Sequence, residues 1–125
     1  MELEALKILV CDDSILIRKK LKDCLKDLGC IQVFEALNGQ EAIDFYKENK
    51  PDLVFMDIVM PIKGGIEAVT EIITFDKNAK VVMASSSGTK THLKKALEAG
   101  AYEFIQKPFE EVQIKNILFS LKGVV

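Results

Sequence analysis

The sequence predicts a doubly wound α/β fold, in which a five-stranded parallel sheet is covered by helices on both faces. Short apolar runs rich in Val and Ile alternate with segments of helical period along the whole chain. The central run, Leu53–Asp57, is apolar at four consecutive positions, as expected of a strand buried on both faces. Because no linker or composition shift interrupts this alternation, we expect one domain over residues 1–125.

The first half of the chain contains two strand–helix units. Lys7–Cys11 is the first expected strand, and Ser14 stands where the N-cap of the following helix is expected. That helix has an apolar face from Ile17 to Leu28 and ends at Gly29. Ile31–Ala36 is a weaker strand, followed by the Asn38-Gly39 turn signal and a helix over residues 40–48.

The second half repeats the pattern three times. Leu53–Asp57 precedes a loop with Pro61 and Gly64-Gly65 and then a helix over residues 66–74. Val81–Ala84 is the fourth strand, and a short helix around Leu93–Leu97 ends at Gly100. Tyr102–Gln106 is the last strand, and a final helix buries four residues: Ile114, Ile117, Leu118 and Leu121.

Composition excludes several classes of protein. The net charge of −2 provides no broad basic surface for nucleic acid or for an anionic membrane. No apolar run is long enough to span a bilayer, and the acidic N-terminus does not resemble a secretion signal. The three cysteines, Cys11, Cys24 and Cys30, lie among apolar residues and are expected to fill the core. This cysteine usage favours a reducing compartment, most simply the cytoplasm.

Polar residues occur where four of the expected strands end. Asp12 and Asp13 follow the first strand, Asp57 ends the third, Ser85 follows the fourth and Lys107 follows the fifth. The carboxyl ends of parallel strands share one edge of a sheet, so these side chains are expected to converge. Three close carboxylates repel one another, and a hard cation with oxygen ligands would offset their charge. Mg²⁺ fits a site of few carboxylates, water and phosphate.

Such a site could carry out phosphoryl chemistry. A carboxylate held beside Mg²⁺ and a lysine can attack phosphorus and form an aspartyl phosphate. Lys107 and the Ser85 hydroxyl would neutralise and position the phosphoryl oxygens around Asp57. No histidine base is needed because a carboxylate is already deprotonated at neutral pH.

The pattern resembles the receiver domains of two-component response regulators, above all the single-domain chemotaxis type. The motifs that carry the resemblance are Asp12-Asp13-Ser14, Asp57 with Met60-Pro61, Ser85, Gly100-Ala101 leading to Phe104, and Lys107-Pro108-Phe109. The resemblance extends over essentially the whole chain, and the motifs together are highly specific. The resemblance implies a flavodoxin-like fold with strand order 2-1-3-4-5. It also implies a signalling phosphoacceptor that catalyses only its own phosphorylation and dephosphorylation.

The resemblance assigns a role to each site residue. Asp57 would accept a phosphoryl group from a phosphohistidine of a sensor histidine kinase. Mg²⁺ would be bound by four residues: Asp12, largely through water, and Asp13, Asp57 and the backbone carbonyl of Val59 directly. Ser85 and Phe104 would be the switch residues, and Lys107 would contact the phosphoryl group. A cis peptide bond before Pro108 is also expected, since X-Pro bonds adopt cis at small cost.

Four positions depart from the usual pattern of the family. Gly64 stands where Asp or Asn is usual, which should make that loop looser. Ser85 replaces a frequent threonine and lacks its stiffening methyl group. Phe104 has no hydroxyl, so its ring cannot hold a switched state by a hydrogen bond. Val59 is apolar at a position that governs water access, so we expect slower self-dephosphorylation than with asparagine there.

The resemblance places the output surface on the fourth helix, the fifth strand and the fifth helix. Its expected contributors, besides Phe104, are Lys90, Lys94, Lys95 and Lys122, facing a downstream target protein. A phosphatase is a further partner that the resemblance implies. A basic cluster on the first helix, Arg18, Lys19, Lys20 and Lys22, is interpreted first as a solvated face and second as a kinase-docking surface. His92 is expected to face solvent or to cap its helix loosely.

Other functions are weaker matches. An aspartate-nucleophile phosphatase would need a second aspartate where Val59 stands, and usually a larger cap domain. An FMN-binding electron carrier would need a phosphate loop where Asp12-Asp13 would repel phosphate. Within the leading class, the chain could act as a phosphorelay intermediate, or be a receiver from a longer DNA-binding regulator. The absence of a linker after Val125 favours the interpretation as a complete protein, acting by protein contact or as a phosphorelay intermediate.

Overall fold

The computed structural model describes residues 2–86 and 90–121 and contains the expected alternation of strands and helices. The strands are β1 Lys7–Cys11, β2 Gln32–Ala36, β3 Leu53–Asp57, β4 Val81–Ser85 and β5 Glu103–Gln106. The helices are α1 Ile15–Asp27, α2 Gly39–Asn49, α3 Gly65–Phe75, α4 Lys90–Glu98 and α5 Glu111–Leu121, preceded by a 3₁₀ turn, η1 Leu3–Ala5. The expected strand boundaries are confirmed to within one residue, whereas η1 was not predicted.

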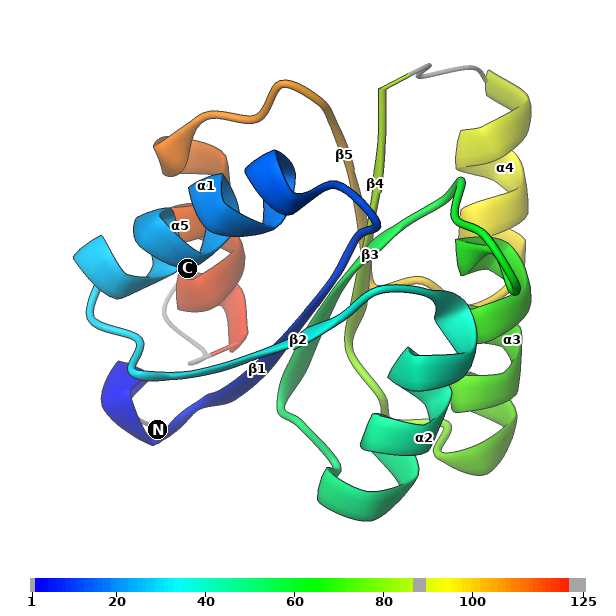
Figure 1. Ribbon diagram of the computed structural model, residues 1–125, viewed down its shortest axis with the longest axis horizontal. Coiled ribbons are helices and arrows are strands. Elements are labelled where there is room, and N and C mark those ends of the chain that lie inside the picture. Colours follow the sequence, from blue (N-terminus) through cyan, green and yellow to red (C-terminus); the bar gives the residue numbers. More distant parts are fainter. Residues whose placement is uncertain (1, 87–89, 122–125) are drawn as a thin grey trace.

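The five strands form one parallel sheet in the order β2-β1-β3-β4-β5, as the resemblance implied. Helices α1 and α5 cover one face of this sheet, and α2, α3 and α4 cover the other (Figure 1). Because all strands run in the same direction, their carboxyl ends lie along one edge. The doubly wound fold is therefore confirmed, together with the shared edge that the site prediction requires.

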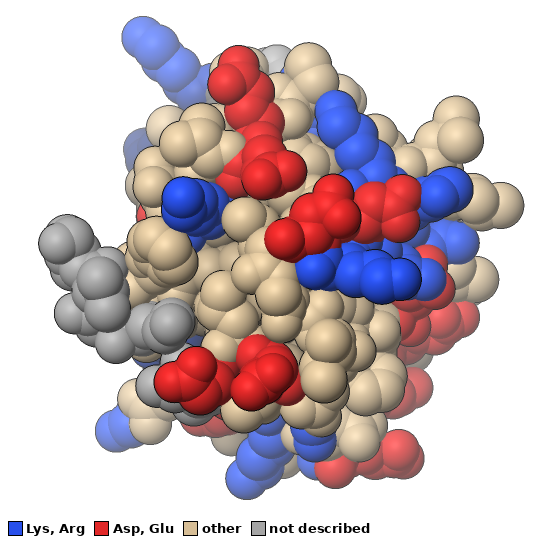
Figure 2. Space-filling model, turned by 90° about the vertical axis from the view of Figure 1, so that its left-hand side faces the viewer, with Lys and Arg blue, Asp and Glu red and all other residues tan. Residues whose placement is uncertain are grey.

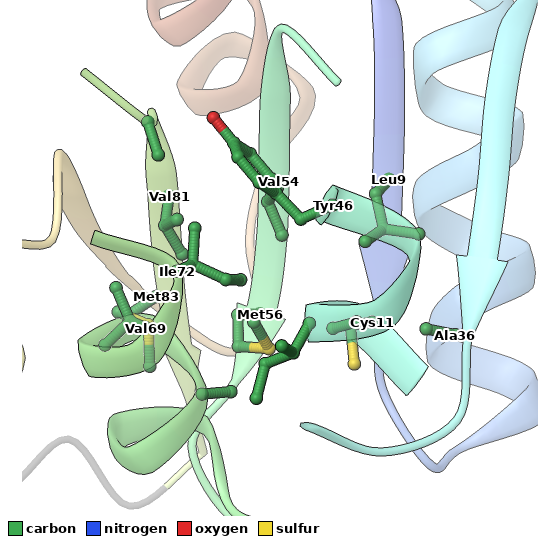
Figure 3. Packing of buried hydrophobic residues seen from close by; sticks show 14 of the residues in the cluster. Leu9, Cys11, Ala36, Tyr46, Val54, Met56, Val69, Ile72, Val81 and Met83 are labelled. Atoms are coloured by element: carbon green, nitrogen blue, oxygen red, sulfur yellow. The ribbon is translucent and has the colours of Figure 1, made fainter. Parts of the chain in front are cut away.

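Each face of the sheet has its own hydrophobic core, since successive side chains of a strand point to opposite faces. Leu9, Val54 and Met56 pack with residues of α2 and α3, such as Tyr46 and Ile72 (Figure 3). The opposite core is formed by alternate residues of the same strands and by α1 and α5, and contains Ile8, Val10, Phe55, Leu25 and Ile114. Burial on both faces explains why β1, β3 and β4 read as continuous apolar runs.

Local signals at the helix ends are confirmed. The Ser14 hydroxyl accepts a hydrogen bond from the Ile17 amide, as an N-cap does. Gly29 and Gly100 follow their helices with positive φ angles of 108° and 104°. Asn38 is an N-cap rather than a turn residue, because its side chain accepts a hydrogen bond from the Glu41 amide.

Several apolar residues of the helices are only half-buried. They lie at the margins of the apolar faces and are Ile17, Cys24, Leu28, Phe45, Ile66, Ile73 and Leu121. The helical period places these residues on the correct side, but it does not distinguish the centre of the interface from its rim.

Candidate functional site

Three carboxylates meet at the carboxyl edge of the sheet, as predicted. Asp12 and Asp13 follow β1, and Asp57 is the last residue of β3, the strand paired directly with β1. One carboxylate oxygen from each of the three lies within 4.8 Å of the others. Asp12 is buried, Asp57 is half-buried and Asp13 is exposed. The cluster thus has one side open to solvent and two of its members anchored in the sheet.

Lys107 joins this cluster from the far end of the sheet. It follows β5, and its Nζ lies 2.5 Å from Asp12 Oδ2 and 3.3 Å from Asp57 Oδ1. Its backbone amide donates a hydrogen bond of 2.9 Å to the carbonyl of Ser85, the last residue of β4. The peptide bond from Lys107 to Pro108 is cis, as expected. Residues 95 positions apart in the chain therefore form one ion-paired group.

Asp12 is held by its neighbours on every side. Its amide donates to the Ala36 carbonyl of β2, and its Oδ1 accepts a hydrogen bond of 2.9 Å from the Ser14 amide. Its own carbonyl accepts a hydrogen bond of 2.7 Å from Nη1 of Arg18. This last contact corrects the sequence interpretation, because Arg18 is buried and does not belong to a solvated or docking face of α1.

Close packing at two glycines fixes the loop that follows β3. A Cβ on Gly65 would lie 2.1 Å from the Asp57 carbonyl oxygen. A Cβ on Gly39 would lie 2.5 Å from the Lys63 carbonyl, to which the Gly39 amide donates. Sequence reasoning treated Gly39 and Gly65 as turn and loop signals, whereas the structure shows that each permits a helix start to approach the loop closely.

The electrostatics of the site fit a divalent cation. Burial raises the pKa of Asp57 above its ordinary value, the nearby negative charge of Asp12 raises it further, and Lys107 opposes both. One lysine therefore offsets only part of the carboxylate charge. Mg²⁺ prefers oxygen ligands, and Asp12, Asp13 and Asp57 offer clustered carboxylate oxygens with an opening to solvent for water ligands. The residues present suit the metal that the sequence predicted.

The remaining predicted site residues lie around this cluster. Ser85 is buried at the end of β4, one residue beyond the register partner of Asp57, Ala84. Val59, in the loop after β3, is 68% exposed. Phe104 lies on β5 in register with Met83, half-buried against the core that α2 and α3 cover. The structure thus brings Ser85 to the predicted edge, and the switch roles of Ser85 and Phe104 stay predictions.

The basic residues of α1 do not form a patch of one sign. Lys19 pairs with Asp23, and Lys22 pairs with Glu35 of β2. On the face where α1 and α5 lie, acidic and basic side chains adjoin each other (Figure 2). Among the expected contributors to the output surface, Lys90, Lys94 and Lys95 are exposed on α4, while Lys122 lies outside the described residues. His92 of α4 is half-buried.

The cysteines behave as core residues rather than as reactive groups. All three are free thiols, Cys11 and Cys30 are buried, and Cys24 is half-buried. Burial raises the pKa of the Cys11 thiol to about 12, and the protonated sulfur lies 3.2 Å from the Asn38 carbonyl. Within residues 2–86 and 90–121, no helix is both long and apolar enough to cross a membrane.

The chain belongs to the response regulator receiver domain family, which its sequence matches over residues 8–119. It is thus a two-component response regulator, a signalling protein rather than a metabolic enzyme.

Individual relatives agree with this assignment. The chain is 41% identical to the protein CcdB of Bacillus subtilis over 94% of its own length and 98% of that protein. It is 42% identical to the chemotaxis protein CheY of Thermotoga maritima, over 90% and 93% of the two chains. A chain of the CheX–CheY–BeF3–Mg²⁺ complex from Borrelia burgdorferi superposes with a TM-score of 0.88 at 34% identity, over 94% of this chain and 89% of that one.

Proposed function

We propose that this protein receives a phosphoryl group on Asp57 from a phosphohistidine of a sensor histidine kinase. The observation that carries the proposal is the ion-paired cluster, in which Lys107 contacts both Asp12 and Asp57 at the carboxyl edge of the sheet. A carboxylate next to a lysine can attack phosphorus when two further carboxylates help to hold a metal cation beside it. The family match supports the same reaction.

In the proposed step an oxygen of Asp57 attacks phosphorus and forms a P–O bond. The P–N bond to the kinase imidazole breaks, and the imidazole nitrogen takes the bonding electron pair and then a proton from water. The Lys107 ammonium, 3.3 Å from Asp57 Oδ1, remains close enough to neutralise a phosphoryl oxygen. The Ser85 hydroxyl is proposed to donate to another phosphoryl oxygen. Hydrolysis of the acyl phosphate by water returns Asp57 and inorganic phosphate.

The carboxylates of Asp12, Asp13 and Asp57 would hold Mg²⁺, with the Val59 carbonyl as a further ligand. When bound, the metal would offset the charge that accumulates between phosphate and carboxylates. The similar complex from Borrelia burgdorferi contains Mg²⁺ and BeF3, which supports this assignment.

The output of the proposed reaction is a change in the surface formed by α4, β5 and α5. Phosphorylation would move Ser85 toward the phosphoryl group and allow Phe104 to turn inward, and a downstream target protein would bind the altered surface. Phe104 is half-buried, so its ring is in contact with the core and partly with solvent, and an inward turn would bury more of it. The similar complex from Borrelia burgdorferi includes CheX, which favours an output by protein contact.

The pathway is proposed to be of the chemotaxis type, because several relatives at 41–45% identity are CheY proteins. A role as a phosphorelay intermediate remains the second candidate from the sequence. A single receiver domain over residues 1–125 and a cytoplasmic location remain predictions from the sequence.

The test is to incubate the protein with acetyl phosphate, with and without Mg²⁺, and to measure its intact mass. We expect a Mg²⁺-dependent gain of one phosphoryl group that Asp57→Asn abolishes. If no gain occurs but beryllofluoride binds, the site is intact and the adduct is short-lived. If the protein gains no phosphoryl group and also does not bind beryllofluoride, the proposed reaction is wrong. The protein would then be a binding module that acts without phosphorylation.

A further inference from the structure

Arg18 is a buried cation next to the site, and the proposed reaction gives it no role. It lies in the first turn of α1, and its side chain is only 10% exposed. A guanidinium is rarely buried unless it is paired, because removing its charge from water is costly. Its partners therefore indicate its role.

The guanidinium connects the end of β1 to β2. Nη1 donates to the Asp12 carbonyl at 2.7 Å, and Nε donates to Oε1 of Glu35 at 3.0 Å. Oε2 of Glu35 accepts a hydrogen bond of 3.0 Å from Lys22, and both cations lower the pKa of Glu35. The donors of a guanidinium have a fixed planar geometry, so Arg18 sets the orientation of the Asp12 carbonyl relative to β2.

The orientation of the Asp12 carbonyl also sets the position of the Asp13 backbone amide. The carbonyl of Asp12 and the amide of Asp13 belong to one rigid peptide plane. The side chain of Asp12 is held directly by Ser14 and Lys107. The carboxylate of Asp13, in contrast, receives no hydrogen bond or ion pair from the part of the chain that the structure describes, residues 2–86 and 90–121. Within the described residues, the backbone is therefore the constraint on where this side chain starts.

We propose that Arg18 is a positioning residue, which fixes the peptide plane before Asp13 and so places the Asp13 carboxylate for a divalent cation. The inference rests on the proposed function, since it concerns the metal ligands of the same site. Within the described residues, Arg18 donates to the Asp12 carbonyl and to Glu35, not to a carboxylate of the acidic cluster. It acts through the backbone of the acidic pair.

The direction of the effect on Mg²⁺ affinity separates positioning from simple electrostatics. A positive charge near the site repels a cation, so its removal alone would strengthen Mg²⁺ binding. Loss of positioning would weaken Mg²⁺ binding, because Asp13 would no longer be held in place. Arg18→Met keeps most of the aliphatic length and removes the charge and all the donors, so the two explanations predict opposite signs.

Lys22→Met is the matched control. Lys22 bonds the same glutamate as Arg18 and carries the same charge, but it does not contact Asp12. We expect Arg18→Met to bind Mg²⁺ about tenfold more weakly than wild type, as is typical when a partner that orients a metal ligand is lost. Lys22→Met should remain within about twofold, because exposed ion pairs contribute little. Isothermal titration with Mg²⁺ alone, on protein shown to be folded by circular dichroism, measures both.

A second measurement does not depend on the metal. In the metal-free protein, the amide NMR signal of Asp13 should shift or broaden in Arg18→Met and stay in place in Lys22→Met. If Arg18→Met does not fold, Arg18→Lys replaces it, since an ammonium cannot span the carbonyl and Glu35 in the fixed geometry of a guanidinium. The lysine variant is expected to show the same changes to a smaller extent.

Two results would overturn the inference. One is unchanged or tighter Mg²⁺ binding in the folded arginine variant, and the other is an Asp13 signal that does not respond. A wild-type protein that takes up no Mg²⁺ would instead refute the proposed metal site, while the metal-free Asp13 signal would still decide the role of Arg18.

Discussion

Gly65→Ala should both destabilise the fold and impair the site, because Gly65 lies against the β3 backbone at Asp57, the proposed phosphoacceptor. An added Cβ would lie 2.1 Å from the Asp57 carbonyl oxygen and 2.9 Å from the terminal methyl of Met83, where ordinary contact begins at 3.4 Å. The methionine can move aside, but the carbonyl cannot. The start of α3 and the end of β3 would have to separate by about 1 Å to remove this overlap.

The cost follows from what that separation breaks. Overpacking of this kind costs about 1–3 kcal/mol. The separation also strains the hydrogen bonds from Gly65 to Ile58 at 2.8 Å and from Ile58 to Ala84 at 3.1 Å, each with a net value of about 1 kcal/mol. We therefore expect a loss of about 3–5 kcal/mol, a large part of the total stability of a small domain.

Gly64→Ala is the matched control for this prediction. Its Cβ would lie 3.2 Å from the Ile58 carbonyl, so a small adjustment suffices, and alanine replaces glycine at an N-cap without a side-chain bond. That variant should lose less than about 1 kcal/mol. Urea unfolding measures both variants, and acetyl phosphate labelling should fall in Gly65→Ala only. Equal urea midpoints for Gly65→Ala and wild type would refute the reasoning. Equal losses of unfolding free energy in Gly65→Ala and Gly64→Ala would also refute it.

Three further predictions concern residues 57–63. Burial and the negative charge of Asp12 raise the pKa of Asp57 above its ordinary value of 3.8. The protonated Asp57 carboxyl therefore contributes fully to stability below pH 3.8, and this contribution is lost as the pH rises through the raised pKa. Asp57→Asn should therefore raise the melting temperature at pH 7 without Mg²⁺ but not near pH 3; equal gains at both pH values would contradict this. Ile62 has a φ of 67° inside a three-residue turn closed by the Lys63 amide and the Pro61 carbonyl. Ile62→Gly should relieve strain and stabilise the protein by about 1 kcal/mol in urea unfolding, and a loss would exclude such strain. Val59 is 68% exposed, and Val59→Asn should shorten the phosphoryl half-life severalfold by orienting water, measured by loss of label after removal of acetyl phosphate.

The sequence was sufficient for the fold and for most of the site because these depend on short-range patterns. Apolar runs such as Leu53–Asp57 define strands, and each strand end identifies the next residue as a candidate for the shared edge. This reasoning located Asp12, Asp13, Asp57 and Lys107, which the structure brings into one cluster.

Contacts between distant segments could not be predicted in this way. Arg18 was grouped with exposed lysines because its helical position borders the polar face, and only its pairing with Glu35 of β2 shows that it is buried. The roles of Gly39 and Gly65 depend on how closely a helix approaches a loop, which a single sequence does not encode locally. An arginine four residues after the Asp12-Asp13-Ser14 motif, with a glutamate near the end of the next strand, is a signal that could have been used.

Lys107 is placed so that it could connect the proposed events at Asp57 to the surface around α4 and β5. Its ammonium contacts Asp12 and Asp57, while its backbone amide is bonded to the Ser85 carbonyl at the end of β4. A phosphoryl group on Asp57 would compete with Asp12 for the ammonium, because phosphate oxygens are strong acceptors for lysine. A shift of Lys107 would then act on both β4 and β5, the strands whose register pairs Met83 with Phe104. Lys107, which offsets part of the charge of the site, would therefore also be the covalent link between the site and the proposed switch.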